Sequence, residues 1–94
     1  MDGINLYHIM IKQYKHANKY YNYAKDCTDK ELLNFYIDEA RSYINRMKIA
    51  DKLFQSKYHD YISNDMSNKM YECLIYEAEK LQYKIDNLLE KSYK

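Results

Sequence analysis

The sequence predicts an all-α fold, an antiparallel bundle of three long helices, on the basis of three observations. The 94 residues include no Pro, one Gly and no Val, which disfavours central strands and the tight turns that join them. Apolar residues recur at helical spacing, and two short polar clusters interrupt that pattern. The helices are expected over about residues 4–26, 29–62 and 65–92, or as four helices if the second breaks near 56–60.

The first expected helix, over 4–26, is amphipathic, although Gln13 interrupts its apolar stripe. Its expected inward positions are Leu6, Met10, Ala17, Tyr21 and Ala24. The helix ends in the first polar cluster, residues 26–31, where Thr28 and Glu31 have the spacing of a capping box. A second helix is therefore expected to begin there.

The second expected helix, over 29–62, has the clearest periodicity. Its apolar residues alternate 3 and 4 positions apart, the a/d spacing of a helix that packs on another helix. These residues are Leu33, Tyr36, Ala40, Tyr43, Met47, Ala50 and Phe54. The opposite face is expected to be polar and consists of Asn34, Asp38, Arg41, Asn45, Lys48, Lys52 and Gln55.

The third expected helix, over 65–92, follows the second polar cluster, Ser63-Asn64-Asp65. Ser, Asn and Asp favour caps and turns because their side chains bond to nearby backbone groups. The apolar spacing of the second helix is repeated here, at Tyr71, Leu74, Ala78, Leu81, Ile85 and Leu88. Short connections then make consecutive helices antiparallel neighbours.

Helix lengths suggest where a partner would bind. At ~1.5 Å per residue, the first helix is expected to cover the second only to near residue 50. The end of the bundle where the second and third helices connect would then expose apolar side chains, a feature that marks interfaces. The predicted contact residues are Phe54, Tyr58, Tyr61, Met66 and Met70. The alternative is that the second helix breaks and the chain closes over this end.

Composition limits the classes of function. With 15 basic and 14 acidic residues the formal charge is +1, so no overall charge directs the chain to nucleic acid or anionic membranes. The sequence contains no long apolar run and no secretory signal, and we expect a single cytoplasmic domain over 1–94. Cys27 and Cys73 are expected to be reduced thiols. The 13 tyrosines suit protein contact, because Tyr is enriched at interfaces.

Two similar segments, which begin at Glu39 and Glu77, are the candidates for a metal site. They resemble the E-x-x-H helices of ferritin-like di-iron proteins, but Ser42 and Lys80 occupy the positions of the histidines. In an antiparallel hairpin the two glutamates would also lie ~16 Å apart along the axis. We therefore expect no metal and no cofactor, and a degenerate, metal-free ferritin-like protein is one alternative.

A second alternative is nucleic-acid binding through the basic first helix. Lys12, Lys15 and Lys19 could contact phosphates, and Tyr23 could stack on a base. Few basic residues would engage, and a lysine stripe is more often a solvated face.

The predicted function is that of a non-enzymatic protein–protein interaction module. The sequence contains no phosphate-binding loop, nucleophile elbow or catalytic triad. We expect a small helical regulator or inhibitor that binds a protein partner and also forms a homodimer. A phage or mobile-element inhibitor of a host defence enzyme, such as an anti-CRISPR protein, is an example of this class by analogy alone.

Overall fold

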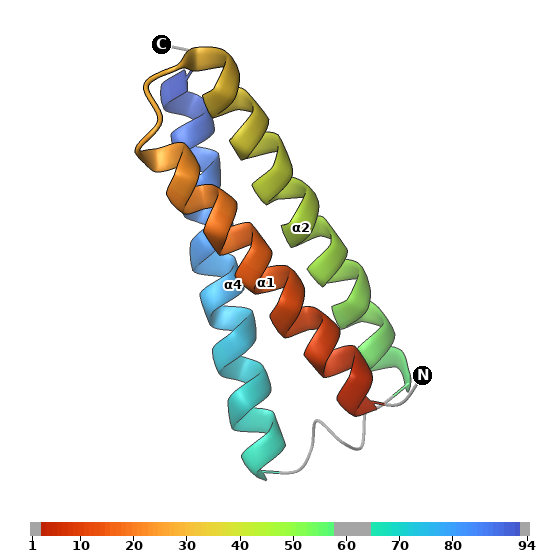
Figure 1. Cartoon of the computed structure of the whole chain (residues 1–94). Helices are drawn as coiled ribbons and strands as arrows, with labels where there is room; N and C mark the ends of the chain where they lie inside the picture. Colours follow the sequence, from red (N-terminus) through yellow and green to blue (C-terminus); the bar gives the residue numbers. More distant parts are fainter. Residues whose placement is uncertain (1–2, 58–64, 93–94) are drawn as a thin grey trace.

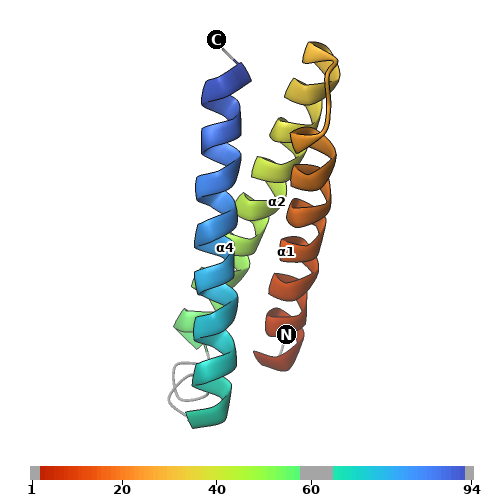
Figure 2. The same cartoon turned by 90° about the vertical axis from the view of Figure 1, so that its left-hand side faces the viewer.

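The computed structural model describes residues 3–57 and 65–92, with side chains described over 5–56 and 69–91. The described part consists of helices α1 (Gly3–Lys25), α2 (Lys30–Lys57) and α4 (Asp65–Ser92). α2 runs antiparallel to both α1 and α4 in an elongated molecule of 46 × 22 × 16 Å (Figures 1 and 2). The predicted all-α bundle of three long helices is confirmed. The alternative break near 56–60 falls mainly on residues outside the described ranges.

The turn between α1 and α2 is held by side-chain and backbone caps. The N–H of Cys27 donates to the carbonyl of Ala24 at 3.1 Å and closes α1. The Asp29 carboxylate accepts hydrogen bonds from the N–H groups of Glu31, at 2.9 Å, and Leu32, at 3.2 Å. Asp29 is thus the N-cap of α2. The capping box predicted at Thr28 and Glu31 is wrong, because the carboxylate one residue later takes the N–H that Thr28 would have bound.

The core consists of two clusters in series along the helices. One holds Ala17, Ala24, Ile37, Ala40, Ile44, Leu81 and Ile85. The other holds Leu6, Met10, Met47, Ala50 and Phe54. α1 and α2 pack against each other along their length, whereas α4 packs less closely on the pair. No described helix combines the length and the apolarity that crossing a membrane requires.

Phe54 lies in the core, contrary to the expectation that α1 covers α2 only to near residue 50. Its side chain is 1% exposed. The Tyr7 ring of α1 has its centroid 6.3 Å from that of Phe54, and the Tyr71 ring of α4 stacks on Phe54 at 5.5 Å. Helical side chains lean toward the N-terminus of their own helix. Phe54 therefore leans into the covered part while Tyr7 leans toward the far end, and the gap closes.

Candidate functional site

α2 carries a second set of apolar side chains that lie about half exposed on the part of the chain that the structure describes. Leu32, Phe35, Ile49 and Leu53 are 43%, 52%, 62% and 45% exposed. With the polar residues between them they form a series at alternating 3 and 4 spacing, here called the outer seam. The outer seam consists of Leu32, Phe35, Glu39, Ser42, Arg46, Ile49 and Leu53. Such spacing places all seven on one side of a helix.

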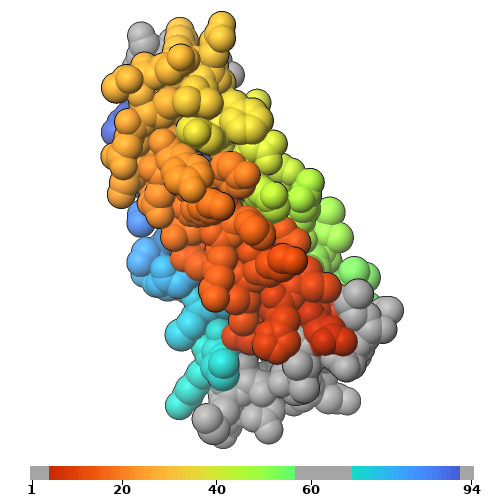
Figure 3. Space-filling model, viewed as in Figure 1, coloured from red at the N-terminus to blue at the C-terminus, as the bar shows by residue number. Residues whose placement is uncertain are grey.

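The outer seam lies on the side of α2 that is turned away from α4. Ile44 lines a cavity between α2 and α4, and Asp51 bonds to a side chain of α4. At ~100° per residue, Phe35 lies about half a turn around α2 from Ile44, and Leu53 about half a turn from Asp51. Figure 3 shows α1 and α2 side by side across one view of the molecule, with α4 visible along an edge. α4 therefore cannot cover the outer seam.

An aromatic cluster of six rings borders the outer seam and joins α2 to α1. It consists of His16, Tyr20, Tyr23, Phe35, Tyr36 and Tyr43. Tyr20 stacks on Tyr43 at 5.6 Å with planes 8° apart, and His16 stacks on Tyr43 at 5.0 Å. Tyr36 meets Tyr23 at 5.4 Å and Phe35 at 5.7 Å. Offset and tilted rings at these separations attract one another beyond the effect of burial.

Two cations lie over rings of this cluster. The Arg46 guanidinium is 4.9 Å from the centroid of Tyr43, and the Lys19 ammonium is 5.9 Å from that of Tyr23. Both distances are within the range of a cation–π interaction. The contact holds Arg46 in place while its side chain stays exposed, so the outer seam presents an oriented positive charge.

A shallow groove of about 270 Å³ continues the same face toward the other end of the molecule. It lies between α1 and α2 and is lined by Leu6, Ile9, Gln13, Arg46, Ile49, Ala50 and Leu53. The amide oxygen of Gln13 is buried there and accepts no hydrogen bond from the described residues. The lining is otherwise mainly aliphatic, which suits an apolar side chain from a partner.

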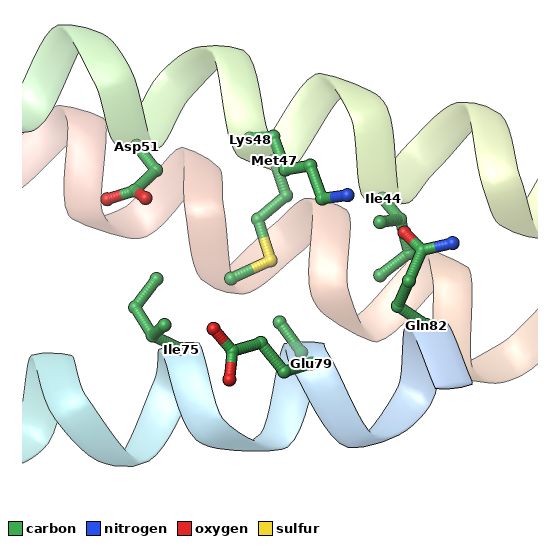
Figure 4. Close-up of a pocket in the computed structure, with 8 residues that line it drawn as sticks. Ile44, Met47, Lys48, Asp51, Ile75, Glu79 and Gln82 are labelled. Atoms are coloured by element: carbon green, nitrogen blue, oxygen red, sulfur yellow. The ribbon is translucent and has the colours of Figure 1, made fainter. Parts of the chain in front are cut away.

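A separate cavity of about 260 Å³ lies between α2 and α4. Its walls include Met47, which points toward α4, and Ile75, while Lys48, Asp51 and Glu79 stand around it (Figure 4). Apolar walls with charged groups around them can hold a small molecule. The described groups here include no catalytic pair of nucleophile and base.

Of the five predicted interaction residues, the structure describes the side chains of two, Phe54 and Met70. Phe54 is core, whereas Met70 on α4 is 57% exposed. Tyr58 and Tyr61 lie outside the described residues, as does the side chain of Met66. The outer seam was missed by the sequence analysis because Glu39, Ser42 and Arg46 separate its apolar members. Testing α2 for a second series at 3 and 4 spacing would have found it.

The residues of the nucleic-acid alternative share one exposed side of α1. Lys12, Lys15, Lys19 and Tyr23 are all exposed. Within this set the Lys19 ammonium lies over the Tyr23 ring.

The two glutamates of the ferritin-like resemblance lie on different helices, α2 and α4. Glu39 belongs to the outer seam, and Glu77 on α4 pairs with Lys80 at 3.7 Å. Across the described ranges, no three His, Cys, Asp or Glu side chains are grouped so that they could hold a metal ion. Cys27 and Cys73 are both free thiols.

In comparisons with known proteins, the chain matches no protein-family model and has no significant match among curated proteins or solved structures.

Proposed function

We propose that the chain is a non-enzymatic protein-binding module and that it binds through the outer seam and the adjoining aromatic cluster. The observation that carries this proposal is the uncovered apolar stripe of α2, four large side chains that are each 43–62% exposed. Large apolar side chains that stay exposed along one side of a small helical protein favour a protein interface. A small regulator or inhibitor would need no more than such a face.

The aromatic cluster supports the same proposal. Its rings are fixed by stacking across α1 and α2, with Tyr20 parallel to Tyr43. A partner can therefore bind the edges of these rings without losing the freedom of mobile side chains on association. Tyr and Arg are also the residue types that most often carry binding energy at interfaces.

The aromatic cluster fits nucleic acid less well. Bases bind proteins by stacking on free ring faces, but Tyr43 has Tyr20, His16 and Arg46 against its ring. If Lys12, Lys15 and Lys19 bound phosphates, affinity for DNA or RNA would fall steeply between about 50 and 200 mM salt. The outer seam contains no lysine, so protein binding is expected to change far less.

Photo-crosslinking in cells that produce the chain tests the proposal. A benzophenone-bearing phenylalanine analogue replaces Ile49 in one sample, and Lys15, on the exposed lysine side of α1, in the control. We expect protein adducts from position 49, identified by mass spectrometry, and none of the same proteins from position 15. If position 49 gives no protein adduct, or if position 15 gives the same adducts in equal yield, the proposal is wrong.

A further inference from the structure

We propose that the outer seam pairs with the outer seam of a second copy of this chain, in antiparallel orientation about a two-fold axis near Ser42. The inference rests on the proposed function, because it names the partner that binds the same surface. Three properties of the outer seam point to a second copy: its spacing, its near-symmetry about Ser42 and the placement of its two charges.

The spacing of the outer seam is that of a helix–helix contact. Leu32 and Leu53 are 21 residues apart, which is three heptads, and the residues between them keep the 3 and 4 alternation. A helix with this pattern packs its seam into the matching seam of another helix. The outer seam spans most of α2, which is 28 residues long; Glu39 and Ser42 at its centre are half-buried, and its other members are exposed.

The outer seam is nearly symmetric about its midpoint. Phe35 precedes Ser42 by seven residues and Ile49 follows it by seven. In an antiparallel pair centred near Ser42, each Phe35 would face Ile49 of the second copy, and each Leu32 would face Leu53. Two-fold dimers require this property, since the same patch must complement itself.

The charges select the antiparallel arrangement. Glu39 lies three residues before Ser42 and Arg46 four after it, so antiparallel pairing places each glutamate opposite the second copy's arginine. Parallel pairing would instead bring like charges to the same level, which is unfavourable. Within the described chain the Glu39 carboxylate forms no ion pair, and the Arg46 guanidinium is oriented by Tyr43. Both groups therefore remain available for contacts between the two copies.

Charge reversal tests both the second copy and the register. We expect Glu39→Arg and Arg46→Glu each to raise the dimer dissociation constant about tenfold or more, because each places like charges opposite one another. The double variant should restore dimerisation. An equal mixture of the two single variants should form a heterodimer, since one copy then carries two arginines and the other two glutamates. Arg41→Glu, an exposed α2 position off the outer seam, is the matched control and should leave dimerisation unchanged.

Sedimentation equilibrium and native mass spectrometry measure these constants, and circular dichroism confirms that each variant keeps its helices. Single variants that dimerise like wild type, or a mixture that stays monomeric, would overturn the register. A wild-type chain that is still monomeric at about 1 mM would contradict the proposal that the outer seam binds a second copy. In that case adducts between position 49 and another protein would leave the proposed protein binding intact, so the two proposals fail separately.

Discussion

The hydroxyl of Tyr71 on α4 donates a hydrogen bond to the carboxylate of Asp51 on α2. The side-chain amide of Gln55 donates to the same carboxylate at 3.0 Å and to the Tyr71 oxygen at 2.8 Å. The Tyr71 ring also stacks on the buried Phe54. Tyr71 therefore joins α4 to α2 by both a polar and an apolar contact, near one end of a helix that otherwise packs less closely.

We expect Tyr71→Phe to lower the free energy of unfolding by about 1–2 kcal/mol, because Asp51 loses a hydrogen-bond donor while the ring stacking remains. Urea unfolding followed by circular dichroism measures the change. Tyr83→Phe is the matched control, since Tyr83 is 69% exposed on the same helix. Equal stability of the two variants would contradict a structural role for the Tyr71 hydroxyl.

Stability is expected to fall in alkaline solution. Burial, the hydrogen bond to Asp51 and the negative charge of Asp51 all raise the pKa of the Tyr71 hydroxyl. Burial also raises the pKa of Tyr14, and the charge of Glu77 adds to the effect. The folded-state pKa of each of these hydroxyls thus exceeds its unfolded value near 10, so the neutral hydroxyl contributes its full stabilisation to the folded state below pH ~10. That stabilisation is lost as the pH rises through the folded-state pKa.

Unfolding free energies measured from about pH 8 to 11 test this dependence. The wild-type chain should lose stability above pH ~10, and Tyr71→Phe should lose it less steeply. A slope unchanged by Tyr71→Phe would assign the dependence to other tyrosines.

Phe54→Ala is expected to lower the free energy of unfolding by about 3–5 kcal/mol, because it removes a fully buried ring that contacts side chains of both other helices. Met70→Ala is the comparison and should change it by less than about 0.5 kcal/mol, since exposed side chains contribute little. Thermal unfolding of both variants decides the matter. If Phe54→Ala were as stable as Met70→Ala, Phe54 would not be part of the core.

Asp29→Ala is expected to cost about 1 kcal/mol of stability, because two N–H groups at the start of α2 lose their acceptor. Thr28→Ala, one residue earlier, should have little effect. Chemical denaturation of the two variants distinguishes the two caps. A larger loss of stability in Thr28→Ala than in Asp29→Ala would instead support the capping box centred on Thr28.

Much of the fold could be read from local patterns. The 3 and 4 spacing predicted α2 and α4 as amphipathic helices, and the inner positions Met47 and Leu81 are buried as expected. A single series of a and d positions, however, describes a helix that packs on one neighbouring helix. α2 packs on both α1 and α4. Ile37 and Ile44, which pack in the cluster that includes Leu81 and Ile85 of α4, were therefore missed.

The candidate site was less accessible to the same reasoning. Helix lengths placed Phe54 beyond the reach of α1, but the rise per residue takes no account of how far an aromatic ring leans along the axis. The apolar residues of the outer seam are visible in the sequence. Only the packed structure shows that Leu32, Phe35, Ile49 and Leu53 stay about half exposed beside α1 and α4.

The sequence by itself determined the helical class, the order of the helices and the positions that could face a core, because these follow from local backbone preferences and residue spacing. The tertiary structure decided which apolar stripe became core and which stayed exposed. α2 carries apolar residues around more than half of its circumference, and α1 and α4 together cover only part of it. Which part stays exposed depends on where α4 docks, and that position is set by packing between residues far apart in the sequence, such as Phe54 and Tyr71.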